Sequence, residues 1–386
     1  MPRKSKAQTP SSVGIINPAT LILLSSFALV MLGMTILFSA SLSVDKQSPF
    51  IYIEKQAVWL VLTFLVGLVI LKVDLEWIRK FVWLGYGIGI IGLVLVLVPG
   101  IGSVINGSRS WIRFGPVGLQ VAEFAKIGLI FFLAHYFSLQ QAERGSFLKG
   151  FIYPCMAIGL VVGLIMLQTD LGTALVISTA SLCILYLAGV KWYFLFPSVI
   201  LGFAGAIATI VNDEERWSRL TAHLDMENQK GDAAYQVWQA ILAFGTGGVD
   251  GVGLGNGRQQ LHFLPEAHTD FILAIVGEEL GMIVTLLVVL IYAVLFIAGI
   301  LHLRKAPNMY QYILASGCLL MVSIQAIINL GVVTGCLPTT GLPLPFISYG
   351  GSNLLVMGIC IAVLLNTCVA WKIPALKQSK RRLKEI

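Results

Sequence analysis

Ten runs of mostly apolar residues, separated by polar segments, dominate this sequence. A helix needs about 20 such residues to cross the hydrocarbon core of a bilayer. Lipid offers no hydrogen-bonding partner to an open backbone, so spans of this length must be helical. The runs lie at about 19–41, 56–72, 81–100, 119–138, 151–168, 173–190, 192–211, 271–300, 311–335 and 353–371. The sequence therefore predicts an all-α polytopic membrane protein with about ten transmembrane helices.

Composition argues against a soluble class. Of the 386 residues, 57% are hydrophobic and 12% are charged, whereas soluble domains carry about 25% charged residues. An even number of spans places both termini on one side of the membrane. The tails and loops on that side carry about twice as many lysines and arginines as the loops on the opposite side. The positive-inside rule therefore places both termini in the cytoplasm. The net charge of +7 reflects this topology and does not indicate nucleic-acid binding.

The chain is expected to form one transmembrane domain, residues 19–371, between basic cytoplasmic tails at 1–18 and 372–386. The first apolar run is longer than the core of a cleavable signal, which is about 7–15 residues, so it should remain as a membrane anchor. One long extracytoplasmic loop, about 212–270, precedes the eighth span. Within it, AAYQVWQAILAF (233–244) is apolar on one side and polar on the other, which predicts an interfacial helix.

Two further stretches are expected to be irregular. GTGGVDGVGLGNG (245–257) lacks the dinucleotide fingerprint and the phosphate-loop lysine. It is either a tightly turned linker or a set of backbone amides that cradle a phosphate. CLPTTGLPLPFISYGGSN (336–353) contains three prolines, which forbid a continuous helix. Non-helical backbone at membrane depth is tolerated only where protein covers it or water reaches it, so this stretch should line a cavity.

Asp270 stands where the long loop meets the eighth span. Partial desolvation there would raise its pKa and make it a better base, but aspartate is also a preferred N-cap. Glu266 and His268 lie beside it. Glu278 and Glu279 follow on the same helix and point about 100° apart, so at most one should face a given partner.

Glu123 and Lys126 form a second charged group, inside an apolar run. Their i,i+3 spacing puts both on one helix face, and an unpaired charge in a membrane is costly. They are either a mutual pair or a pair that lines a substrate cavity. Arg109 lies on the outer side, where its planar donor fork suits phosphate recognition, although simple solvation is the alternative. Asp170 most simply caps the sixth span.

These motifs together resemble the SEDS family (shape, elongation, division and sporulation) of cell-wall glycosyltransferases, the FtsW/RodA group. The matching stretches are NGSRSWI (106–112), LQVAEFAK (119–126), LQTDLGT (167–173), GVGLGNGRQQLHFLPEAHTDFI (251–272), GEELG (277–281) and LPTTGLPLPFISYGGS (337–352). NGSRSWI and PEAHTDF look more like the division branch, FtsW, than the elongation branch, RodA. The family usually has proline where Thr169 and Val121 stand, which affects helix entry.

The resemblance implies a ten-span enzyme that polymerises lipid II into glycan strands at the outer face of the cytoplasmic membrane, for septal wall synthesis in cell division. The essential aspartate of the family falls on Asp270, which we interpret as the general base. Its buried Glu–Lys pair falls on Glu123 and Lys126. The side chains expected to contact substrate are Arg109, Glu123, Lys126, Arg258, Glu266, His268, Ser348 and Tyr349.

No protein metal site or cofactor is indicated, because the six cysteines lack metal-ligand spacing. A divalent cation such as magnesium or manganese could still counter the pyrophosphate charge. The expected partners are lipid II, a class B penicillin-binding protein, other divisome membrane proteins and membrane lipids. Two other functions stay open. A precursor flippase would need a polar path through the bilayer, and a non-catalytic scaffold would only recruit the penicillin-binding protein.

Overall fold

The computed structural model describes residues 17–44, 50–105, 107–115, 117–225, 234–259 and 263–370. Ten helical segments in these ranges are long and apolar enough to cross a membrane, as predicted. The long helices are α1 (Pro18–Val44), α2 (Ile51–Lys72), α4 (Val82–Leu97), α5 (Val121–Leu139), α6 (Tyr153–Leu167), α7 (Leu171–Ala188), α8 (Trp192–Val211), α11 (Ile272–Leu303), α12 (Met309–Val333) and α13 (Gly351–Ala370). Short helices α3 (Leu75–Ile78) and η1 (Arg79–Phe81) extend α4, and η2 (Phe147–Ile152) extends α6. The predicted basic tails lie almost wholly outside the described residues.

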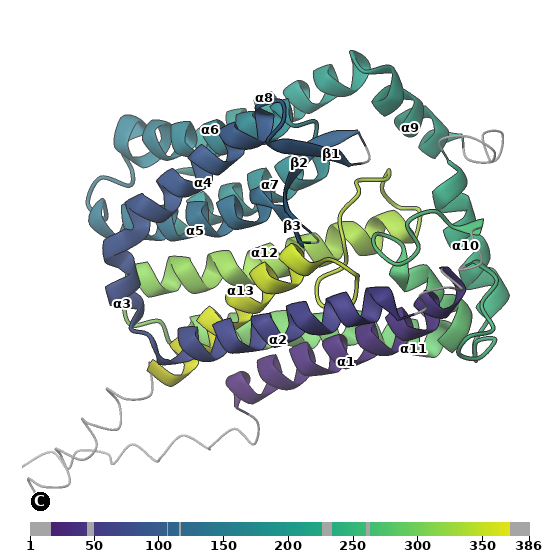
Figure 1. The fold of residues 1–386 in the computed structure, drawn as a ribbon. Coiled ribbons are helices and arrows are strands. Elements are labelled where there is room, and N and C mark those ends of the chain that lie inside the picture. The colour runs from purple at the N-terminus through teal and green to yellow at the C-terminus, as the bar shows by residue number, and fades with distance from the viewer. Residues whose placement is uncertain are drawn as a thin grey trace, which may run out of the picture.

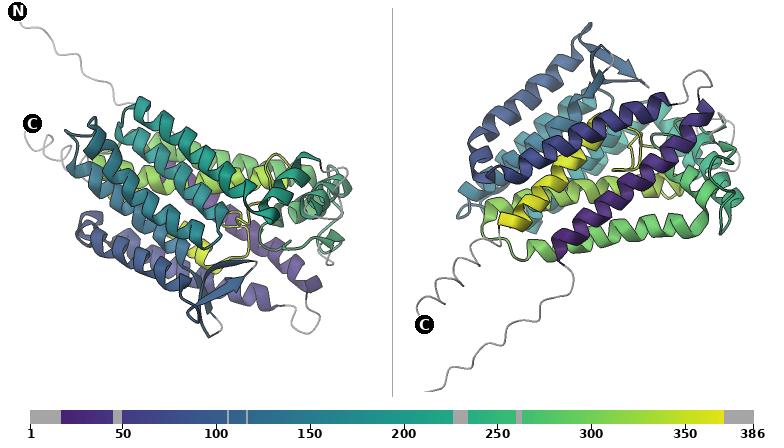
Figure 2. Two further views of the ribbon diagram at one scale, coloured as in Figure 1. Left: turned by 90° about the horizontal axis from the view of Figure 1, so that it is seen from above. Right: turned by 60° about the horizontal axis from the view of Figure 1, so that its bottom comes forward.

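The long helices run side by side, and α1 begins at the same end of the bundle at which α13 ends (Figure 1). We call this the terminal end. The opposite, loop end carries a small sheet and the helices α9 (Glu214–Leu224) and α10 (Tyr235–Gly247), and the views of Figure 2 agree. In an 18-residue stretch of each helix, 78% of the residues are buried in α12 and in α13, against 6% in α8. The bundle is therefore built around α12 and α13, with α8 at its periphery.

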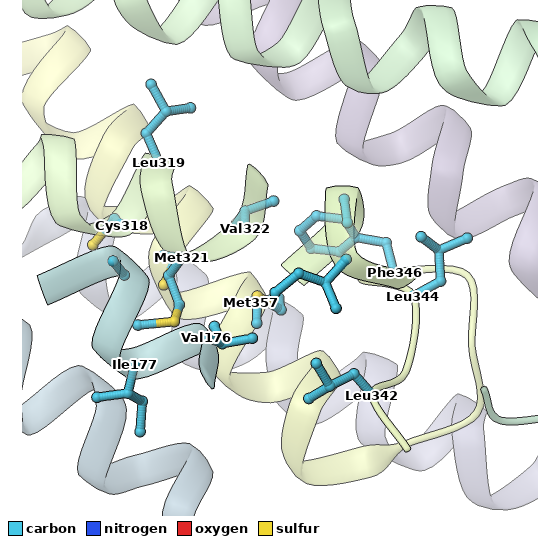
Figure 3. Packing of buried hydrophobic residues seen from close by; sticks show 14 of the residues in the cluster. Val176, Ile177, Cys318, Leu319, Met321, Val322, Leu342, Leu344, Phe346 and Met357 are labelled. Atoms are coloured by element: carbon cyan, nitrogen blue, oxygen red, sulfur yellow. The ribbon is translucent and has the colours of Figure 1, made fainter. Parts of the chain in front are cut away.

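The loop end holds two irregular segments. Residues 248–259, here the glycine segment, follow α10, and residues 336–350, here the proline segment, join α12 to α13. The proline segment is packed into the bundle by Leu342, Leu344 and Phe346, which are at most 5% exposed. These side chains share one buried cluster with Val322 and Met357 (Figure 3). Apolar packing thus holds non-helical backbone within the membrane domain, where protein covers it. The cavity expected along this segment stays a prediction.

A three-stranded antiparallel sheet stands where the sequence predicted only a loop between two spans. Its strands are β1 (Gly102–Ile105), β2 (Ser108–Phe114) and β3 (Val117–Gln120), in that spatial order. Gly107 and Gly115 follow β1 and β2 with φ of +77° and +62°, a conformation that glycine adopts without strain. β3 runs directly into α5, so the sheet sets where α5 enters the bundle.

The predicted eighth span is broken. Within α11, Gly281 has φ of +77° and ψ of −178°, which is not helical. A Cβ at this position would lie 2.3 Å from the carbonyl oxygen of Val249. Only glycine permits both the backbone conformation and the close approach of the glycine segment. Glu278 and Glu279 therefore lie at the end of a short helix and not in the middle of a continuous span.

Candidate active site

Asp270 does not cap the helix that follows it, so the capping alternative is wrong. The N-cap position of α11 is Phe271, whose side chain makes no capping hydrogen bond. The carboxyl group of Asp270 instead points toward the proline segment, since a Cβ on Gly341 would lie 3.7 Å from Asp270 Oδ2. Asp270 is partly exposed. Its carboxyl group therefore takes no part in capping α11 and is available for another role.

The surroundings of Asp270 change its acidity. Burial among protein atoms raises the pKa of Asp270 to about 7, and the carboxylates of Glu266 and Asp170 act in the same direction. Arg219 of α9 opposes them. A base works best when its pKa lies near the working pH, because it must be ionised yet still hold a proton well. Near neutral pH Asp270 is thus a carboxylate suited to accept a proton.

Asp170 and Glu266 add negative charge near Asp270, and each accepts hydrogen bonds from its own neighbours. Asp170 caps α7, as predicted, by accepting a hydrogen bond of 2.9 Å from Thr173 N. It also accepts one of 3.2 Å from Gln120 Nε2. Glu266 accepts a bond of 2.9 Å from Thr269 Oγ1 and has φ of +54°, an uncommon conformation for a residue with a side chain. Strained backbone of this kind concentrates at functional sites.

The proline segment and the residues before α11 lie in contact. Tyr349 N donates a hydrogen bond of 3.0 Å to His268 O. The rings of His268 and Tyr349 lie beside that of Tyr52 on α2, with centroids 4.7 Å and 5.2 Å from it. Burial lowers the pKa of His268, so its ring is neutral near pH 7. Three partly exposed rings from three segments therefore lie together, and one of them, His268, is two residues before Asp270.

Ser348, which was expected to contact substrate, is buried and hydrogen-bonded to protein groups. It is 4% exposed, and its hydroxyl accepts a hydrogen bond of 2.8 Å from Leu344 N. Its carbonyl accepts one of 3.2 Å from Gln56 Nε2, and Gln56 Oε1 accepts one of 3.3 Å from Gly350 N. Ser348 thus shapes the turn that presents Tyr349, and Gln56 ties that turn to α2.

Glu123 and Lys126 form the buried pair that the sequence predicted. Lys126 Nζ lies 2.8 Å from Glu123 Oε1, and the two side chains are at most 1% exposed. Asn353 of α13 donates to the other Glu123 oxygen at 3.2 Å. Lys126 also donates to Gln325 Oε1 of α12 at 3.1 Å. The pair is therefore enclosed by hydrogen-bonding partners from two other helices.

The two arginines named from the sequence lie elsewhere at the loop end. Arg109 donates from Nη1 to Leu97 O at 3.4 Å, at the end of α4. Arg258 is exposed on the glycine segment. Arg219 of α9 is the arginine whose charge acts on Asp270. It was missed because only the folding of the long loop brings α9 toward α11. Among the residues that the structure describes, no three His, Cys, Asp or Glu side chains are grouped to hold a metal ion.

The glycine segment binds protein carboxylates. Glu278 accepts hydrogen bonds from Arg258 N and Gln259 N at 2.9 Å and 3.1 Å. Glu279 accepts one of 3.0 Å from Gly255 N. The linker alternative is thus confirmed, because these amides are not open to a phosphate. The two glutamates bond different groups, as their directions predicted: Glu279 also accepts a hydrogen bond of 2.8 Å from Ser39 Oγ of α1. Both reach the glycine segment because it wraps around the broken end of the helix.

Comparison with known proteins decides the family. The model of the family described as "Cell cycle protein", which covers FtsW, RodA and SpoVE, matches residues 19–372. The chain belongs to this FtsW/RodA/SpoVE family. One relative is the probable peptidoglycan glycosyltransferase FtsW of Coxiella burnetii, 39% identical over 89% of this chain and 94% of the relative. Stage V sporulation protein E of Bacillus subtilis is 37% identical over 91% of this chain and 96% of its own length.

Solved structures of the same family share the fold. The rod shape determining protein RodA of Thermus thermophilus is 25% identical with a TM-score of 0.68, over 93% of this chain and 98% of that one. A chain from a structure titled "Structural coordination of polymerization and crosslinking by a peptidoglycan synthase complex" has a TM-score of 0.74 at 25% identity, over 91% and 97%. The FtsW/RodA/SpoVE chain described here is thus a multi-pass membrane protein with the architecture of its family.

Proposed function

We propose that this protein is a peptidoglycan glycosyltransferase that polymerises lipid II, with Asp270 as the general base. The observation that carries the assignment is the placement of the Asp270 carboxyl group, which does not cap α11 and faces the proline segment at the loop end of the bundle. The direction in which burial shifts its pKa, upward to about 7, agrees with this role. The names of the relatives support the activity, and their FtsW identity supports a role in septal wall synthesis. The excess of lysine and arginine toward the terminal end supports a cytoplasmic location for both termini. The loop end then faces the outside, where lipid II is polymerised.

The chemistry needs one proton transfer. Asp270 takes the proton from the acceptor sugar hydroxyl as that oxygen attacks the anomeric carbon of the donor. The bond from this carbon to the lipid pyrophosphate breaks in the same step, and attack opposite the leaving group inverts the configuration. Pyrophosphate leaves readily once its charge is countered, so a second carboxylate acting as acid is not required, unlike in glycoside hydrolysis.

Positive charge at the loop end supports the departure of the pyrophosphate. Arg219 acts on Asp270 electrostatically and so lies near the reacting groups. Arginine binds phosphate oxygens through its planar donor fork, and charge aimed at a leaving oxyanion lowers the barrier. Arg109 and Arg258 are further candidates for this role. The rings of Tyr52, His268 and Tyr349 supply an apolar, partly exposed surface for the sugar faces.

The expected partner is a class B penicillin-binding protein that cross-links the new strands at the division site. A structural relative comes from a complex that coordinates polymerisation with crosslinking. Other divisome membrane proteins are further candidates. This partnership is a proposal about assembly and does not change the assignment of Asp270.

Purified protein supplied with lipid II in detergent tests the function. We expect glycan polymer from the parent chain, and at least a 100-fold loss in Asp270→Asn, since general-base catalysis contributes about 10²–10⁴-fold. Asp250→Asn, which neutralises an exposed carboxylate of the glycine segment, is the matched control and should keep its activity. Substantial polymer from Asp270→Asn would refute the general base. No polymer from the parent under any condition would favour the flippase or the scaffold.

A further inference from the structure

Two amide side chains of α12 connect the buried charge pair to the main chain of Asp270. Asn329 Nδ2 donates hydrogen bonds to Asp270 O at 2.8 Å and to Leu342 O at 2.7 Å. One turn earlier, Gln325 Nε2 donates to Pro343 O at 2.9 Å. Gln325 Oε1 accepts the bond from Lys126. Both amide side chains are at most 1% exposed. A continuous set of contacts therefore runs from Lys126 through α12 and the proline segment to Asp270.

The proline segment cannot satisfy its own backbone. Pro343 and Pro345 have no N–H, so the carbonyls around them cannot join a regular ladder. Buried carbonyls need donors from elsewhere. A side-chain amide has two N–H groups. Asn329 uses its amide nitrogen to reach two carbonyls that lie 72 positions apart in the sequence, one before α11 and one before α13.

We propose that Asn329 is a positioning residue, supported by Gln325, that sets the separation between Asp270 and the proline segment. In this arrangement Glu123 and Lys126 act on catalysis through α12, by orienting Gln325, and do not bind the substrate. The inference rests on the proposed function, because it assigns Asp270 as the group to be positioned. It accounts for a buried ion pair that contacts the site only through hydrogen-bonded neighbours.

The molecule contains a chemically matched control. Asn366 of α13 is 6% exposed, and its Nδ2 donates to Ile70 O at 2.7 Å and to Val73 O at 2.8 Å. It thus makes the same two bonds to main-chain carbonyls, but at the terminal end, around the end of α2. Loss of Asn366 should lower stability for the same reason as loss of Asn329. Only Asn329 should affect the reaction.

The test compares Asn329→Ala with Asn366→Ala in the full-length purified protein. We expect similar falls in Tm, but a fall in kcat of about 100-fold for Asn329→Ala alone, because a displacement of about 1 Å at a reacting group has that effect. KM for lipid II should change little. The lower pH midpoint of kcat should also move down in Asn329→Ala, since a looser Asp270 is better hydrated and its pKa falls toward the ordinary range.

Amide hydrogen exchange without substrate supplies the second readout. Exchange in residues 263–271 and 336–350 should rise in Asn329→Ala and stay at the parental level in Asn366→Ala. Equal losses of kcat in the two variants, or a parental pH midpoint and parental exchange in Asn329→Ala, would overturn the proposal. If Asn329→Ala does not fold, Asn329→Ser, which keeps one donor, replaces it under the same criteria. An active Asp270→Asn variant would refute Asp270 as the base. Hydrogen exchange in residues 263–271 and 336–350 would still show whether Asn329 holds these two segments together.

Discussion

The glycine segment and the proline segment lie at the same end of the bundle, yet opposite kinds of polar group hold them. The glycine segment presents N–H groups, which donate to the carboxylates of Glu278 and Glu279. To the side chains of other helices, the proline segment presents mainly carbonyls, which accept from Gln325 and Asn329. Tyr292 of α11 adds a hydroxyl donor to Pro345 O. At the end of the segment, Tyr349 and Gly350 donate from N–H to His268 O and Gln56 Oε1. The backbone composition of each segment thus determines the chemistry of the side chains that bind it.

This difference follows from the residues that break the helix in each case. Glycine keeps its N–H and can turn it toward a common point, as positive φ at Gly251, Gly253 and Gly255 allows. Proline removes the N–H and leaves carbonyls in excess. Buried polar groups of either kind need a partner, because an unpaired one costs about 1–3 kcal/mol. A carboxylate therefore suits the glycine segment, and an amide or hydroxyl suits the proline segment.

The largest expected effect comes from removing the partner of a buried charge in the network that supports the proline segment. Lys126→Ala removes the partner of buried Glu123, which should cost about 3–5 kcal/mol of stability. The double variant Glu123→Gln with Lys126→Met removes both charges and should recover most of the loss. Thermal unfolding of the purified proteins measures both. Equal stability of the single and double variants would show that the charge pair is not closely coupled.

Exchanging the two kinds of partner tests the comparison directly. Gln325→Glu keeps the acceptor for Lys126 but sets a carboxylate oxygen against Pro343 O, and Glu278→Gln sets an amide N–H against a backbone N–H. Each should cost about 1–3 kcal/mol. Hydrogen exchange should rise in the proline segment for Gln325→Glu and in the glycine segment for Glu278→Gln. A rise in the same segment for both variants would contradict the pairing of carboxylates with the glycine segment and of amides with the proline segment.

The next effect, on the proline side, comes from pH and is small per pH unit. The folded-state pKa of Asp270, about 7, lies above the unfolded value of about 3.9. The folded protein thus binds this proton more tightly, so the stabilisation is complete below about pH 4 and is lost as pH rises through 7. The slope is at most about 1.4 kcal/mol per pH unit. Tm measured from pH 4 to 8 should show this decline in the parent and lose that contribution in Asp270→Asn. An unchanged slope would contradict the raised pKa.

The smallest expected effect comes from two glycines that share a backbone conformation and differ in their distance from Asp270. Gly341 and Gly255 have φ of +69° and +78°. A Cβ on Gly255 meets nothing within 4 Å, and one on Gly341 meets only Asp270 Oδ2, at 3.7 Å. Alanine at either site should cost about 1–2 kcal/mol through its conformation alone. Polymerisation assays should show a lower rate only for Gly341→Ala, whose methyl group would lie in contact with the carboxyl group of Asp270 and take up space beside it. Equal rates would mean that substrate does not approach Asp270 from the proline segment.

The sequence by itself determined the features that depend on neighbouring residues. Ten spans follow from apolar run length, because lipid leaves the backbone no other partner. The Glu123–Lys126 pair follows from i,i+3 spacing, and the Asp170 cap from its place before a helix. Asp270 was found from its position at a loop–span junction, and its role came from the family resemblance. Apart from the role of Asp270, each of these conclusions needs only geometry within one element or at its end.

Tertiary structure alone decided the rest. The break at Gly281, the grouping of Glu278 with Glu279 and the effect of Arg219 on Asp270 all depend on how the long loop folds back onto α11. The link from Asn329 to Asp270 joins residues 59 positions apart. Such contacts have no local signal, because a polar residue in an apolar span shows that a partner must exist without showing which one. The partner is chosen by the unpaired backbone groups that packing brings within hydrogen-bonding distance.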